Sequence, residues 1–123
     1  MKLFETALNN LQSVLEYREI PSSLDNISSG IFRHLRRIDY AIKRFKKHRF
    51  SVPYGLQNIL RVGVYLIVFD ENFQNEIAVN TAVEYAKKEG YTKQAGFVNV
   101  ILRKMCDANW RMISTPAPDN YPA

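Results

Sequence analysis

The chain has few side chains of the types that carry out covalent or acid–base catalysis. Its single cysteine, Cys106, has neither of the two histidines, His34 and His48, near it in sequence. No glycine-rich phosphate loop, serine elbow or HExxH spacing occurs. One cysteine excludes an internal disulfide and, with two histidines, leaves too few ligands for a structural zinc site. We therefore expect no catalytic residue, no metal and no cofactor.

Positive charge is the chemistry that the sequence does carry, and one segment holds most of it. The chain has 17 Lys and Arg against 12 Asp and Glu, a formal charge of +5. Between Arg33 and Arg49 there are eight basic residues and a single acidic one, Asp39. Like charges three or four residues apart on a helix repel one another, and a negatively charged partner would remove that cost.

The spacing within this segment predicts an amphipathic helix from about residue 24 to residue 47, with Gly30 as a candidate bend. Two sets of residues recur every three or four positions and centre on opposite sides of the helix. The apolar set is Leu24, Ile27, Ile31, Leu35, Ile38, Ile42 and Phe45. The set expected to face solvent is Arg33, Arg36, Arg37, Tyr40, Lys43, Arg44 and Lys47.

The basic stripe has three possible interpretations, and the pattern favours the first, nucleic acid binding. The stripe can be an ordinary solvated face, although such faces usually mix the two signs. It can also lie on an anionic membrane, but the segment contains no Trp. No apolar run approaches the ~18 residues of a membrane span, and no signal peptide is apparent, so we expect a cytoplasmic protein without a membrane partner.

The remaining apolar periodicities predict further helices joined by short loops. One is expected over about residues 2–17, and a second over 56–69 is apolar on nearly all sides and therefore central. Two more are expected at about 75–89 and 92–105, separated by Gly90 in the conformation that ends helices.

These helices predict an all-α domain of five to six helices over residues 1–110. Residues 111–123 contain three of the five prolines and are expected to form a Pro-rich tail or linker.

Three polar residues lie inside apolar stretches and are expected to be structural. Arg61 falls in the most apolar helix and needs a carboxylate, for which Asp39 and Glu84 are the candidates. Asn80 and Asn99 are expected to bond across helices or to tie down a loop; contact with a nucleic acid base is the alternative.

Three ordered segments resemble the NusB family. They are Ile-Leu-Arg-Val-Gly-Val-Tyr-Leu-Ile-Val-Phe at 59–69, Ala-Val-Asn-Thr-Ala-Val-Glu-Tyr-Ala-Lys at 78–87, and Ala-Gly-Phe-Val-Asn-Val-Ile-Leu-Arg at 95–103. The resemblance covers roughly residues 27–105. It implies two packed antiparallel three-helix bundles that bind RNA.

Within the family, residues 29–39 and 95–99 are most similar to the N-terminal domain of Sun/Fmu-type rRNA cytosine-5 methyltransferases. The resemblance thus implies an accessory rRNA-binding domain without catalytic residues of its own, with a methyltransferase catalytic domain as a partner. The alternative is a transcription antitermination factor that acts with a small-subunit ribosomal protein. The arginine-rich start of that factor's first helix has no counterpart in residues 1–6, which are nearly neutral.

RNA is accordingly the partner expected for the basic set, with Lys and Arg on phosphates and Tyr40 stacked on an unpaired base. The resemblance also implies a second RNA contact at Tyr91, Lys93 and Phe97, at the start of the last helix.

Overall fold

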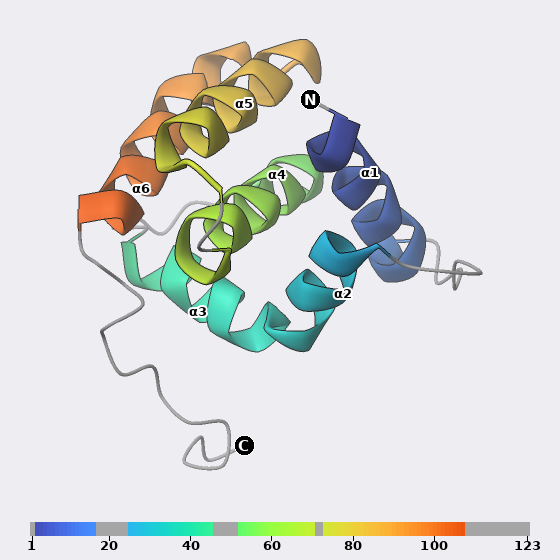
Figure 1. Cartoon of the computed structure of the whole chain (residues 1–123). Coiled ribbons are helices and arrows are strands. Elements are labelled where there is room, and N and C mark those ends of the chain that lie inside the picture. Colours follow the sequence, from blue (N-terminus) through green and yellow to red (C-terminus); the bar gives the residue numbers. More distant parts are fainter. Residues whose placement is uncertain (1, 17–24, 46–51, 71–72, 108–123) are drawn as a thin grey trace.

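The computed structural model describes residues 2–16, 25–45, 52–70 and 73–107, and every regular element in these ranges is a helix (Figure 1). The all-α fold class is therefore confirmed. In chain order the elements are α1 (Lys2–Leu11), η1 (Gln12–Glu16), α2 (Asn26–Arg33), α3 (Leu35–Phe45), α4 (Tyr54–Val64), η2 (Tyr65–Phe69), α5 (Asn75–Lys88), η3 (Thr92–Gln94) and α6 (Ala95–Asp107). The expected tail at 111–123 lies outside the described ranges.

Helix α4 runs through the middle of the bundle, as its apolar sequence predicts (Figure 1). It contacts α5 and α6 on one side, and α1 and α3 on the other. Gly63 lets α4 approach its neighbours closely, because a methyl group there would overlap Leu102 of α6. The β-branched end of this segment continues as the helical turn η2 and forms no strand.

Helices α5 and α6 form a hairpin that closes at Gly90. This residue has φ +93°, in the left-handed region that glycine adopts without strain. The amide of Tyr91, which follows it, donates a hydrogen bond of 2.7 Å to the carbonyl of Ala86. The position is the one expected for a helix end, and it places Tyr91 next to the end of α5.

The basic segment is two helices, and the prediction of a single helix bent at Gly30 is wrong. The break between α2 and α3 lies at His34, whose φ and ψ are −110° and 18°. The His34 ring stacks on Phe69 of η2, with ring centroids 4.4 Å apart and planes 9° from parallel. Gly30 instead allows close packing of α2 on η2, because a methyl group at this position would overlap the side chain of Tyr65.

A polar contact holds the start of α2 against α1. Asn10 donates hydrogen bonds from Nδ2 to Oγ of Ser28 at 3.0 Å and to Oδ1 of Asp25 at 3.3 Å. Ser28 is fully buried, so this contact satisfies a hydroxyl that water cannot reach. It joins the basic helix pair to the rest of the bundle.

Candidate nucleic-acid interface

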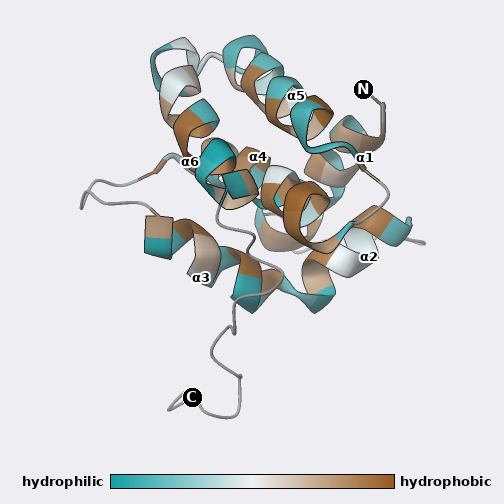
Figure 2. Ribbon diagram, turned by 60° about the vertical axis from the view of Figure 1, so that its left-hand side comes forward, coloured by the Kyte–Doolittle hydropathy of each residue, from teal (hydrophilic) through white to brown (hydrophobic). Residues whose placement is uncertain are grey.

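The cations of α2 and α3 lie on one side of the helix pair, and we name this surface the basic face. Its members are Arg33, Arg36, Arg37, Lys43 and Arg44. Four of them are exposed and Arg37 is partly exposed, whereas Ile31, Ile38 and Ile42 on the opposite side are buried. Figure 2 shows hydrophilic positions along the outer edge of α3. The predicted amphipathic pattern therefore persists across the break at His34.

Asp39, the one carboxylate among these cations, is turned toward α4. It accepts two hydrogen bonds from Arg61, from Nε to Oδ1 at 2.8 Å and from Nη2 to Oδ2 at 3.0 Å. Arg61 also donates from Nη1 to Oδ1 of Asn58 at 2.8 Å. Of the two predicted partners of Arg61 the structure selects Asp39, and it leaves Glu84 exposed on α5.

The basic face therefore keeps its charge. Within the described part of the chain, none of its five cations forms an ion pair with a carboxylate. Such a face has a high density of positive charge on a firmly packed support, which is the arrangement that neutralises a row of phosphates.

Two further members of the predicted stripe are less well placed. Tyr40 is half-buried and packs partly against the core, so only part of its ring faces solvent. Lys47 lies beyond Phe45, outside the described residues. Stacking of Tyr40 on a base stays a prediction.

His34 is a part of this surface that sequence reasoning left out. It lies at the break between Arg33 and Arg37 and is half-buried against Phe69. Burial, and then the charges of Arg37 and Arg33, lower the pKa of His34 below its ordinary value. The imidazole is therefore neutral at neutral pH and adds no charge to the basic face.

The second predicted contact set does not join the basic face. Tyr91 lines a cavity with three glutamates, and its hydroxyl lies against Gly55 of α4. Lys93 is exposed on η3, and Phe97 packs partly against the core. Helix α6 begins near the α1 side of the bundle and only its far end approaches α3 (Figure 1). RNA contact by these three residues stays a prediction, but it would involve a separate surface.

The two asparagines behave differently from the expectation. Asn80 is exposed on α5. Asn99 accepts a hydrogen bond from Nε of Arg103 within its own helix at 3.1 Å, and Arg103 reaches Glu76 of α5 at 3.1 Å. Asn99 therefore makes no contact with α5 through these bonds. It orients Arg103, and Arg103 forms the contact between α6 and Glu76 of α5. The hydrogen bond from Arg103 lowers the pKa of Glu76.

Other chemistry finds little support in the described ranges. Burial, with a smaller effect of Asp107, raises the pKa of the Cys106 thiol, which keeps it protonated and unreactive. No three His, Cys, Asp or Glu side chains gather there as a metal site would require. No helix in these ranges is long and apolar enough to cross a membrane.

The comparison with known proteins identifies a family and several named relatives. A model of the NusB family matches residues 2–107. The transcription antitermination protein NusB of Fervidobacterium nodosum is 31% identical over 108 residues, which cover 85% of this chain and 72% of the relative. The protein of the same name from Clostridium botulinum is 35% identical over 120 residues, covering 82% of each chain. No solved structure matches significantly.

These relatives correct the expectation of an rRNA methyltransferase accessory domain. They carry the name of an antitermination factor, and the alignments span most of both chains. The segments that suggested the methyltransferase branch serve packing here. Gly30 makes room for Tyr65, Asp39 binds Arg61, and Ala95 and Val98 are buried. Such residues reflect the shared fold and do not discriminate between activities. The relatives' shared name also agrees with the expectation of a non-enzymatic chain.

Proposed function

Because the chain belongs to the NusB family, we propose that it is an RNA-binding factor of the transcription antitermination type that holds the RNA backbone on its basic face. The relatives are named as transcription antitermination proteins. A transcription complex is therefore the setting that we propose, in the bacterial cytoplasm, with a small-subunit ribosomal protein as a protein partner.

One observation carries the RNA proposal. Five cations share the exposed side of α2 and α3, and the only carboxylate among them is bound by Arg61 on the other side. An ordinary solvated face would mix the two signs, and this one does not. Arginine predominates, and its planar group binds phosphate oxygens in pairs.

The proposed mechanism is backbone recognition with a contribution from stacking. The cations of α3 form two pairs, Arg36 with Arg37 and Lys43 with Arg44, which lie seven residues or about two helical turns apart on the same side of the helix. The two pairs can bind separate phosphates of a single strand. Tyr40, on the same helix, can offer the exposed part of its ring to an unpaired base. The neutral His34 beside Arg33 and Arg37 can exchange hydrogen bonds with a base edge without changing the charge.

The test is to measure the affinity of a single-stranded RNA for two matched double variants. Arg36→Gln with Lys43→Gln removes two charges from the basic face, and Lys87→Gln with Lys88→Gln removes two from α5. We expect the first variant to bind at least about tenfold more weakly and its log–log salt slope to fall by about 1.4, since each phosphate contact contributes about 0.7 for single strands. The α5 variant should change little. Equal losses in both variants would refute the assignment of the basic face.

A further inference from the structure

His34 lies among the cations of the basic face and is not itself charged at neutral pH. It occupies the break between α2 and α3, directly after Arg33 and three residues before Arg37. Its ring stacks on Phe69 of η2, with centroids 4.4 Å apart, and this contact fixes the position of the imidazole. The residue is partly exposed, so a ligand held by the two arginines would also approach the ring.

No protein group stabilises a proton on this imidazole. In the described part of the chain the ring nitrogens of His34 take part in no hydrogen bond and no ion pair with another side chain. The pKa of His34 is lowered first by burial and then by the charges of Arg37 and Arg33. Burial belongs to the fold, whereas an anion that neutralises the two arginines would remove the other two effects. A phosphate is such an anion, and it also accepts a hydrogen bond from a protonated imidazole.

The other charged and titratable groups around the ring leave this balance to the two arginines. On α2, the first turn of α3 and η2, with the residues that flank them, these groups are Asp25, Arg33, Arg36, Arg37, Tyr65 and Asp70. Burial, and then the charge of Asp70, raise the pKa of Tyr65, so its hydroxyl stays neutral where a histidine titrates. Asp25 accepts a hydrogen bond from Asn10, and neither Asp25 nor Asp70 forms an ion pair with His34.

We propose that His34 is a conditional phosphate ligand of the basic face, which takes up a proton from solvent when RNA phosphates bind Arg33 and Arg37 and donates a hydrogen bond to one of them. Proton uptake and RNA binding then favour each other, so RNA affinity increases as the pH falls below neutral. The base-edge contact of the ring belongs to neutral pH, and the phosphate contact replaces it at lower pH. This inference rests on the proposed function, because it requires RNA on the basic face.

The probe is an oligouridylate added to the full chain, since uracil bases and phosphodiesters do not titrate near neutral pH. The ring signals of His34 in NMR give its pKa without RNA and with saturating RNA. We expect the pKa to rise by about one unit on binding, at the lower end of what a nearby opposite charge produces. The affinity should then be about fivefold higher at about pH 5.5 than at about pH 7.5.

Two histidine variants assign this dependence to one ring. His34→Phe keeps a ring for Phe69 and cannot take up a proton, so its RNA affinity should change less than about twofold over the same pH range. His48 is the other histidine of the chain and lies outside the described residues. His48→Phe is therefore the matched control, and it should keep the fivefold increase.

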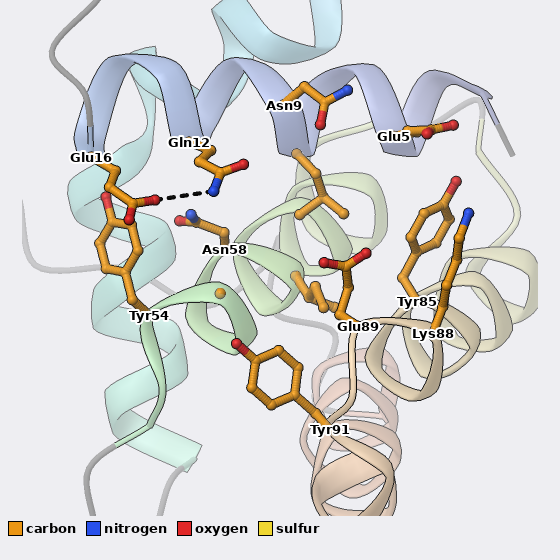
Figure 3. Close-up of a pocket in the computed structure, with 13 residues that line it drawn as sticks. Glu5, Asn9, Gln12, Glu16, Tyr54, Asn58, Tyr85, Lys88, Glu89 and Tyr91 are labelled. Atoms are coloured by element: carbon orange, nitrogen blue, oxygen red, sulfur yellow. Dashed lines mark hydrogen bonds between the residues drawn. The ribbon is translucent and has the colours of Figure 1, made fainter.

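Carboxylates are a second source of pH dependence, because their protonation removes negative charge. Glu5, Glu16 and Glu89 line a cavity between α1, the first turns of α4 and the end of α5, and none of its lining residues belongs to the basic face (Figure 3). Glu16→Gln with Glu89→Gln removes two of these charges at exposed positions, so folding should survive. This double variant should show the same pH dependence of RNA affinity as the natural chain.

The inference is overturned by a His34 pKa that does not rise in the saturated complex. A pH dependence that persists in His34→Phe, or that disappears in His48→Phe or in the glutamate variant, would also overturn it. Its failure is distinguishable from failure of the proposed function. If Arg36→Gln with Lys43→Gln weakens RNA binding while the His34 pKa stays unchanged, RNA occupies the basic face and only the role of His34 is wrong. If that variant binds RNA as tightly as the natural chain, both proposals fail.

Discussion

Arg61 and Asp39 show how one residue pair controls the charge of a neighbouring surface. Arg61 is 13% exposed and Asp39 is 37% exposed, so the pair lies at the boundary between the core and the basic face. By accepting hydrogen bonds from Arg61, Asp39 satisfies a nearly buried guanidinium and is drawn away from the cations of α3. The need of Arg61 for a carboxylate is readable from sequence, because a charge in so apolar a helix must be compensated. The choice of partner depends on which helices touch.

Replacing Asp39 with Asn removes this charge and keeps the side-chain shape. We expect the free energy of unfolding to fall by about 1–2 kcal/mol, less than for a fully buried pair because Asp39 is partly solvated. Urea unfolding measures the change. Glu84→Gln, at an exposed position on α5, is the control and should stay within about 0.5 kcal/mol. Similar losses in the two variants would show that Arg61 does not depend on Asp39.

His34 has a lowered pKa, which makes stability depend on pH. Below its ordinary value of 6.5, the unfolded chain takes up a proton that the folded chain resists. The contribution of His34 to the free energy of unfolding is therefore complete above about pH 6.5. It decreases as the pH falls below that value. His34→Phe keeps a ring for Phe69 and cannot titrate. Between about pH 7.5 and about pH 5.5 the natural chain should lose more stability than this variant does. Parallel losses would contradict the placement of His34.

At the scale of elements, apolar periodicity predicts most of the helices, including the central one and the turn at Gly90. It fails at α2 and α3, where one helix was expected. The pattern is continuous through His34, so nothing local marks a break. The break coincides with a ring contact to Phe69 in a distant segment, and a one-dimensional pattern does not contain such a contact. The cavity lined by Tyr91 could not be predicted either, because its lining residues come from helices that are far apart in the sequence.

The packing of α2 on η2 depends on Gly30. In Gly30→Ala the new methyl group would overlap the Tyr65 hydroxyl, so we expect a loss of about 1–3 kcal/mol in the free energy of unfolding. Adding Tyr65→Leu removes the hydroxyl and the two ring carbons that the methyl group would also overlap, and it should restore part of the loss. Gly96→Ala in α6 is the matched control, since nothing lies within 4 Å of its added methyl group.

The control should gain about 0.4–1 kcal/mol, because alanine restricts the unfolded chain and favours a helix. Thermal or urea unfolding of Gly30→Ala, of the double variant and of Gly96→Ala measures these changes in stability. A loss at Gly96 as large as that at Gly30 would mean that helix propensity, and not contact with Tyr65, sets the cost.

For the whole molecule, the main feature is the separation of charge. The basic face occupies α2 and α3, whereas Glu5 of α1, Glu16 of η1 and Glu89 at the end of α5 line an acidic cavity. The formal charge of +5 says nothing of this division. A molecule built in this way attracts RNA to the basic face, because a phosphate would be repelled at the acidic cavity.

The most direct test of the central claim is amide chemical-shift mapping of the full chain with a single-stranded RNA, followed over a range of salt concentrations. The account predicts shifts concentrated at Arg33, Arg36, Arg37, Lys43 and Arg44 that weaken steeply as salt rises, with Glu89 and Gly55 unchanged. Shifts confined to the α5–α6 hairpin or to α1, with the basic face silent, would contradict it.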